Sequence, residues 1–163
     1  MKTKSLFCLT VLVLIFLQTF SQEKTQQPDL LIKSTHDELY PIHYQSKDYD
    51  SLVEANYYHM GYGEMHMWRK NKQAEVSAIF RQSISPKYYE QLNKKMWIIH
   101  MKVTSYGQVA SISIYFKEDL LIDINELSKL AEDLKKNVTY ELTFSKKVTD
   151  FFYVPICFVA PKL

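Results

Sequence analysis

Residues 97–116 read WIIHMKVTSYGQVASISIYF, and they show the clearest structural pattern in the chain. Apolar and polar side chains alternate from Trp97 to Thr104 and again from Ala110 to Phe116, which is the period of a strand with one buried face. Residues 105–108 separate the two runs, and Gly107 can adopt the positive φ that a tight turn requires. The stretch therefore predicts a β-hairpin.

A helix is predicted soon after the hairpin. Asp123 and Glu126 have the spacing of a capping box at a helix start. Four apolar residues follow at the i, i+3, i+4, i+7 spacing of an amphipathic helix, namely Leu127, Leu130, Ala131 and Leu134. We expect this helix to end at Asn137.

Two further strands complete the C-terminal part of the chain. Tyr140, Leu142 and Phe144 alternate with polar residues, and a last apolar run extends from Phe151 to Val159. Pro155 interrupts this run and has no N–H to donate to a neighbouring strand. The final strand is therefore predicted at a sheet edge or at a bulge.

The segment before the hairpin predicts one strand and one helix. The alternation of Val76, Ala78 and Phe80 predicts a strand over residues 75–83. Ser85 can cap a helix by accepting a backbone N–H, and Pro86 suits the first helical position. Four apolar side chains then fall on one side of the expected helix, namely Tyr88, Tyr89, Leu92 and Met96.

Together these elements predict an α+β domain over residues 75–163, in the order β-α-β-β-α-β-β. We expect an antiparallel sheet with two amphipathic helices on one face. Residues 30–74 mix tyrosines with charges and show no clear period, so an irregular N-terminal extension is expected there. Residues 22–29 are polar and are expected to be a flexible leader.

The N-terminus has the pattern of a signal peptide. A basic start precedes an apolar run from Leu6 to Leu17, and Thr19 and Ser21 have the spacing of small residues before a cleavage site. The run is shorter than the roughly 20 apolar residues of a transmembrane helix, so we expect cleavage of residues 1–21 and no membrane span in the mature chain. The Ser-Gln pair at the cut resembles export signals of Bacteroidota, which implies the periplasm or cell surface of a Gram-negative bacterium.

The charge balance excludes some partners. The chain has 20 basic and 18 acidic residues, and residues 1–21 hold two of the basic ones and none of the acidic ones. The mature chain therefore has 18 (20 − 2) basic residues against 18 acidic ones. A neutral surface without a basic tract gives no reason to expect nucleic acid as a partner.

The C-terminal pattern resembles a known family. The run Met101-Lys-Val-Thr-Ser-Tyr-Gly-Gln-Val-Ala-Ser-Ile-Ser-Ile is similar to the strand, Gly-x-Val turn and strand of TonB C-terminal domains, and Val154-Pro-Ile-Cys-Phe is similar to their last strand. The resemblance covers about residues 75–161. The chain lacks the long anchor and proline-rich spacer of a true TonB. It also resembles the small uncharacterised secreted proteins of Bacteroidota.

The TonB resemblance implies a binding function. Domains of that family bind a short peptide of an outer-membrane transporter by adding a strand to their sheet. We therefore expect a non-enzymatic binding or adaptor domain that pairs an envelope protein or peptide with an edge strand, over residues 151–159 or the neighbouring residues 138–144. The residues expected at this edge are Tyr140, Leu142, Phe152, Val154 and Ile156. The sequence leaves the oligomeric state open.

A copper-handling protein is the alternative hypothesis. The segment His59-Met-Gly-Tyr-Gly-Glu-Met-His-Met-Trp68 is rich in thioether and imidazole groups, which suit copper(I). The candidate ligands are His59, Met60, Met65, His66 and Met67. The competing interpretation is a turn between aromatic segments, with the methionines as core filler.

No familiar catalytic motif occurs in the sequence, so no cofactor other than copper and no catalytic residue is predicted. A second polar cluster comprises His36, Asp37, Glu38 and His43, where a solvated loop is expected. His100 is expected on the exposed face of its strand. Cys157 is expected to be a small buried residue, with a nucleophile or an interchain bridge as alternatives. A small hydrolase or inhibitor of unfamiliar type also stays open.

Overall fold

The computed structural model describes residues 30–34, 42–56, 59–116 and 122–163. The expected signal peptide and leader lie outside these residues. The described elements, in chain order, are β1 (Leu30–Ser34), β2 (Ile42–Ser46), the 3₁₀ helix η1 (Tyr49–Ser51), β3 (Met65–Arg69), α2 (Gln73–Ser83), the 3₁₀ helix η2 (Pro86–Tyr88), α3 (Tyr89–Lys94), β4 (Trp97–Thr104), β5 (Val109–Phe116), α4 (Ile124–Asn137), β6 (Tyr140–Phe144) and β7 (Tyr153–Val159). This is an α+β fold, as predicted.

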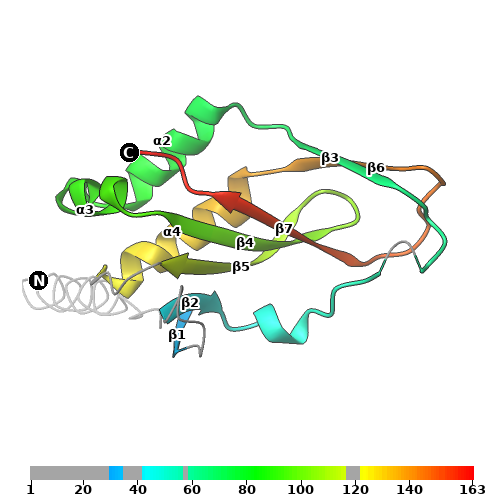
Figure 1. The fold of residues 1–163 in the computed structure, drawn as a ribbon, viewed down its shortest axis with the longest axis horizontal. Coiled ribbons are helices and arrows are strands. Elements are labelled where there is room, and N and C mark those ends of the chain that lie inside the picture. The colour runs from blue at the N-terminus through cyan, green and yellow to red at the C-terminus, as the bar shows by residue number, and fades with distance from the viewer. Residues whose placement is uncertain (1–29, 35–41, 57–58, 117–121) are drawn as a thin grey trace, which may run out of the picture.

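The main sheet has five antiparallel strands in the order β1-β2-β5-β4-β7, and Figure 1 shows the hairpin β4–β5 at its centre. The predicted hairpin is confirmed, because Trp97 lies opposite Phe116 and Met101 opposite Ile112. Gly107 in the connecting turn has a φ of 87°. β3 and β6 form a separate antiparallel pair.

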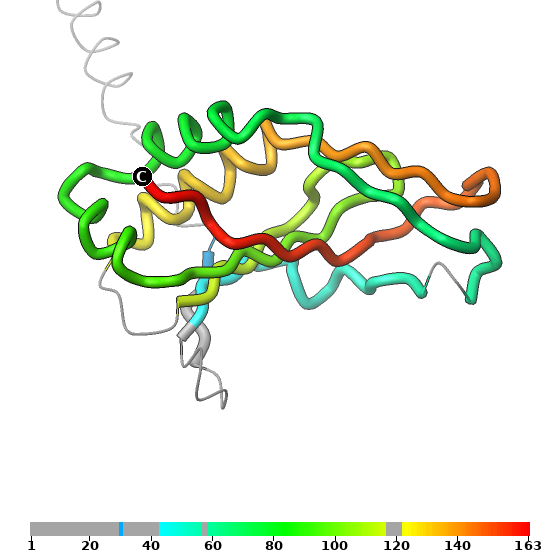
Figure 2. Tube along the Cα trace, turned by 45° about the horizontal axis from the view of Figure 1, so that its top comes forward, coloured from blue at the N-terminus to red at the C-terminus, as the bar shows by residue number. Residues whose placement is uncertain are grey.

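The core lies between the sheet and the helices α2 and α4, which cover the same face of the sheet (Figure 2). Trp97 stacks on Phe116 at 5.4 Å between ring centroids and meets the edge of Phe80 at 5.2 Å. The apolar stripe predicted for α4 is buried, and Leu127, Leu130 and Leu134 are each 0 % exposed. Burial of each such leucine contributes roughly 1.5–3 kcal/mol.

Residues 75–83 are helical, so the predicted strand there is wrong. The buried residues of α2 are Val76, Ile79, Phe80 and Ser83, which have the i, i+3, i+4, i+7 spacing of a helix rather than the alternation of a strand. The Glu75 carboxylate also accepts the Lys72 backbone N–H at 3.1 Å and so stabilises the first turn. The observed order from α2 onward is therefore α-α-β-β-α-β-β.

Two predicted helix caps also differ from the structure. Asp123 caps α4 by accepting the Asn125 backbone N–H at 2.9 Å, but Glu126 does not close a capping box. Glu126 instead accepts the backbone N–H and the hydroxyl of Ser85, both at 2.6 Å. Ser85 is therefore a cross-link between α4 and the η2–α3 segment, and its side chain caps no helix.

The prediction that residues 30–74 are irregular is wrong. This segment supplies β1 and β2 to the main sheet, where β2 pairs with β5. It also supplies β3, which pairs with β6 and keeps β6 out of the main sheet. The fold therefore depends on contacts between both halves of the chain, and no domain boundary separates them near residue 75.

Candidate binding edge of the main sheet

β7 lies at one margin of the main sheet, as its proline predicted. It pairs with β4 over seven residue pairs, from Thr104 opposite Tyr153 to Ile98 opposite Val159. Within the described residues no strand lies along its other side, apart from a single bridge at Tyr153. This outer side of β7 is the candidate binding edge.

The hydrogen bonds at both ends of the β4–β7 ladder show which backbone groups face outward. Ser105 donates to the carbonyl of Phe152 at 2.8 Å, and Ala160 donates to the carbonyl of Trp97 at 3.1 Å. In an antiparallel pair, alternate residues direct their N–H and C=O toward the partner. The even-numbered residues of β7 therefore face β4, and the backbone groups of residues 153, 155, 157 and 159 face away from it.

Pro155 lies at one of these outward positions, opposite Lys102. A proline at an inward position would remove a hydrogen bond from the ladder, whereas at an outward position it removes none. The outward donors that remain on the strand beyond Pro155 are the N–H groups of Cys157 and Val159. The outward acceptors are the carbonyls of these two residues and of Pro155.

The first outward carbonyl of β7 already has a partner in the chain. The Ala55 N–H donates to the Tyr153 carbonyl at 3.1 Å, and Glu54 forms a parallel bridge with Tyr153. The segment from Asp48 to Ala55, which we call the strap, crosses the sheet face opposite the helices to reach this point. The open part of the edge therefore begins at Pro155.

The strap is held to the sheet mainly by polar contacts. The buried Lys102 ammonium donates to the Leu52 carbonyl at 2.6 Å, lies 3.8 Å from the Glu54 carboxylate and sits 4.5 Å above the ring of Tyr49. Ser111 adds a bond of 2.7 Å to the Asp48 carboxylate. Burial raises the pKa of Tyr49, with Tyr115 as a further cause, so its hydroxyl stays protonated at neutral pH.

A polar cluster on the same sheet face borders the open edge. Cys157 lies opposite His100 on β4, and Tyr115 contacts both His100 and His43, with ring centroids 4.7 Å apart in each case. His43 is buried and its Nε2 lies 3.1 Å from the Gln45 side-chain oxygen. The Nδ1 atom of His43 has no hydrogen-bond partner among the described residues.

The ionisation of this cluster argues against a nucleophilic cysteine. Desolvation raises the pKa of the Cys157 thiol, although its side chain is exposed, whereas an activated thiol needs a lowered pKa. Desolvation lowers the pKa of His100. The charge of Glu54 acts to raise this pKa, and His43 acts to lower it. The expectation of a buried Cys157 is wrong, and His100 is half-buried rather than exposed.

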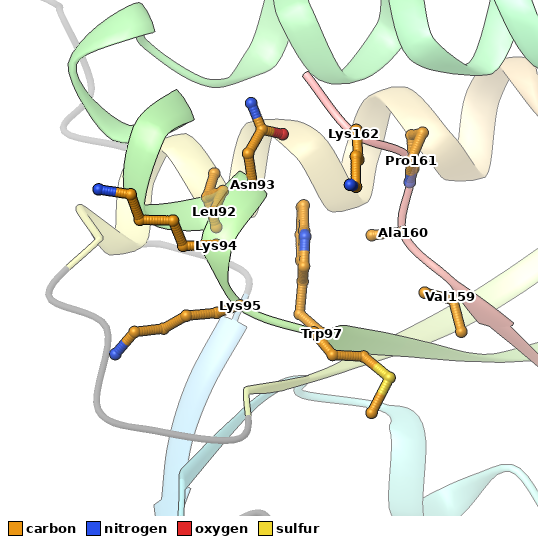
Figure 3. A pocket seen from close by; sticks show the side chains of 10 residues that line it. Leu92, Asn93, Lys94, Lys95, Trp97, Val159, Ala160, Pro161 and Lys162 are labelled. Carbon is orange, nitrogen blue, oxygen red and sulfur yellow. The ribbon is translucent and has the colours of Figure 1, made fainter.

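A cavity of about 220 Å³ lies at the end of β7 (Figure 3). Its lining comes from residues 92–97, at the junction of α3 and β4, and from residues 159–162. Leu92, Trp97 and Ala160 are buried and form an apolar floor. The sequence does not predict this cavity, because nothing in the local pattern of either segment shows that the two meet.

Most of the five residues predicted at the binding edge have side chains that are buried in the core. Phe152, Val154 and Ile156 are buried beneath the sheet, and Tyr140 is buried on β6. Leu142 is partly buried against the core. The side chains beside the open edge are instead those of Pro155, Cys157 and Val159. Strict alternation along the strand that contains Pro155 places these three residues on one face.

The copper candidates do not come together on one face. Met65 and Met67 alternate with His66 along β3, so the methionines and the histidine lie on opposite faces of that strand. His59 and Met60 belong to a turn, and Met65 packs against the Tyr62–Phe152 cluster. A site from all five residues would need the β3 region to rearrange, and the copper hypothesis stays a prediction that metal analysis of the purified chain would test.

The remaining candidate sites contribute little. His36, Asp37 and Glu38 lie outside the described residues. Within the described ranges, no group of three or more histidine, cysteine, aspartate or glutamate side chains could hold a metal ion. In that same part of the chain, no helix is long and apolar enough to cross a membrane.

Comparison with known proteins yields a likeness of fold. No protein-family model matches the chain, and no curated protein matches it. The chain is similar to the crystal structure of a DUF5043 family protein from Bacteroides uniformis, with a TM-score of 0.56 and 10 % sequence identity, over 82 % of this chain and 86 % of that chain. The expected resemblance to TonB C-terminal domains is not confirmed. The predicted first strand is helical, and β6 lies outside the main sheet.

Proposed function

We propose that the chain is an exported, non-enzymatic binding module that pairs an extended segment of an envelope protein with the outer edge of β7. The open edge from Pro155 to Val159 is the main support for this proposal, because its backbone donors and acceptors face away from the sheet. An added strand would bond to these groups, which is how many domains recognise extended peptides.

Two features of the surroundings support this use of the edge. The strap already bonds to β7 at Tyr153, so the outer side of the strand accepts an extended neighbour without distortion of the β4–β7 ladder. The side chains of Pro155, Cys157 and Val159 beside the open edge are exposed and uncharged, so a second strand meets no charge that it would have to desolvate there.

The edge can be tested through one backbone group. Cys157→Pro removes an outward N–H and leaves the β4–β7 bonds in place, whereas Cys157→Ala removes the thiol and keeps the N–H. We expect Cys157→Pro to weaken a partner captured from an envelope extract about tenfold or more, since one lost hydrogen bond leaves a carbonyl unpaired. Cys157→Ala should bind as the parent chain does.

The affinity of each variant would be measured by biolayer interferometry, with circular-dichroism melting curves as a check on folding. Equal binding by a folded Cys157→Pro chain would refute the role of the edge. So would an extract that yields no partner sensitive to this substitution.

A further inference from the structure

The open edge of β7 consists of five uncharged residues, Pro155 to Val159. Its outward backbone groups are the N–H donors of Cys157 and Val159 and the carbonyl acceptors of Pro155, Cys157 and Val159. Cys157 lies at the centre of the segment and supplies one donor and one acceptor. A segment of this kind can bond to a copy of itself across a two-fold axis.

The hydrogen bonds of such a pair follow from the geometry of an antiparallel ladder. With the axis beside Cys157, the two copies of this residue lie opposite each other and exchange both N–H···O bonds. Val159 then lies opposite Pro155 of the second copy and donates its N–H to the Pro155 carbonyl. Both outward donors of each copy are therefore paired, and the missing N–H of Pro155 affects only the Val159 carbonyl.

The extent of the open edge favours this register over the neighbouring ones. A pair whose axis lies one residue further toward the C-terminus joins only residues 157–159 of each copy. A pair whose axis lies one residue the other way directs the Val159 N–H to the Tyr153 carbonyl, which already accepts the Ala55 N–H. The register centred on Cys157 uses the whole open segment and avoids the strap.

The two ends of β7 are compatible with this pairing. The strap occupies the outer side of the strand at Tyr153, so the strand of a second copy must end opposite Pro155, and its last residue there is Val159. The chain leaves the strand after this residue (Figure 3). Asn93 holds the C-terminal residue Leu163 toward α3, because its side chain donates to the Leu163 carbonyl at 2.8 Å and accepts the Leu163 N–H at 2.7 Å.

The side chains are also complementary in this register. On the face opposite the helices, Pro155 meets Val159 of the second copy, and on the helix face Ile156 meets Phe158 of the second copy. Val159 is 58 % exposed and Phe158 is partly buried, so both have apolar surface left to bury. The segment carries no charge, so pairing brings no like charges together within it.

We propose that the extended segment that pairs with β7 is β7 of a second copy of this chain, so that two chains form a two-fold dimer with Cys157 beside the axis. This inference rests on the proposed function and specifies its partner. The dimer joins the two main sheets into one continuous sheet. A single pair of short strands buries little area, so we expect a dissociation constant that is roughly micromolar or weaker.

The test places a charge beside the two-fold axis. Cys157→Lys and Cys157→Glu each bring two like charges together in the dimer, whereas an equimolar mixture of the two variants brings opposite charges together. We expect each variant alone to dimerise about tenfold or more weakly than the parent chain, and the mixture to regain dimerisation. Sedimentation velocity of residues 22–163 from about 1 µM to about 1 mM measures the dissociation constants.

The matched controls are Thr143→Lys and Thr143→Glu. Thr143 is likewise an exposed, uncharged residue within a strand, but it lies on β6, outside the main sheet. Both control variants should dimerise as the parent chain does. Equal weakening by the Thr143 and Cys157 variants would show a general charge effect and would contradict pairing at Cys157.

The outcomes separate this inference from the proposed function. A parent chain that stays monomeric throughout the concentration range, or a dimer that both Cys157 charge variants leave unchanged, would overturn the pairing of two copies through β7. An envelope partner that is lost in Cys157→Pro would then leave the edge proposal intact. A partner that binds folded Cys157→Pro as well as the parent chain would overturn the edge proposal itself.

Discussion

Gly107 occupies a position that no other residue can fill without rearrangement. Its φ is 87°, and a Cβ there would collide with the backbone carbonyl of Tyr140, whose N–H bonds to the Gly107 carbonyl at 2.8 Å. Gly61 has a similar φ of 82° but open space around it. A substitution at Gly61 therefore introduces backbone strain alone, whereas a substitution at Gly107 also introduces a steric clash.

We predict that Gly61→Ala lowers the free energy of unfolding by roughly 1 kcal/mol, the cost of a left-handed alanine. Gly107→Ala should lower it by roughly 3 kcal/mol or more, because the turn and the start of β6 must also separate. Urea denaturation of both variants checks this. Equal losses of unfolding free energy would mean that the hairpin turn rearranges to accommodate the added methyl group.

The η2–α3 segment is joined to α4 chiefly by the contact of Ser85 with Glu126. Glu126 is largely buried and receives two hydrogen bonds from Ser85, while Glu132 on the same helix is exposed. Hydrogen bonds to a charged group contribute roughly 1.5–3 kcal/mol, and loss of one partner leaves the other unsatisfied.

We predict that Glu126→Ala lowers the free energy of unfolding by roughly 2 kcal/mol and Glu132→Ala by less than about 0.5 kcal/mol. Ser85→Ala combined with Glu126→Ala should cost less than the sum of the single changes, because each change removes the hydroxyl–carboxylate bond. Chemical denaturation of the four proteins gives the coupling energy. Strict additivity would show that the contact does not operate in solution.

At the level of the whole chain, the strap joins the N-terminal segment to the candidate binding edge. Lys102 contacts Leu52, Glu54 and Tyr49 at once, so it holds most of the strap's interactions with the sheet. Lys102→Met keeps the buried stem and removes the charge. The strap should then open locally while the rest of the sheet stays folded.

Hydrogen exchange at Ala55 measures this opening, because its N–H bonds to Tyr153 across the edge. We predict about tenfold or faster exchange at Ala55 in Lys102→Met and unchanged exchange in the β4–β5 ladder. Lys70→Met is the control for the loss of an exposed lysine. Unchanged exchange at Ala55 in Lys102→Met would show that the strap is held by other contacts.

The sequence predicted the elements whose evidence is local. The hairpin over residues 97–116 and helix α4 each bury one face continuously, so their periods are clear. The alternation of Val76, Ala78 and Phe80 favours a strand over residues 75–83. The same residues contain the helical spacing of Val76, Ile79 and Phe80, and packing against α4 favours the helix.

Local sequence was enough to predict an α+β fold with a central hairpin and a final strand at an edge or a bulge, because side-chain period and the missing proline N–H are properties of the local chain. The three-dimensional packing alone shows that β2 completes the sheet, that Lys102 holds the strap, and that residues 92–97 and 159–162 line one open cavity. These features join segments distant in the chain, and which distant surfaces meet depends on packing that local periodicity does not encode.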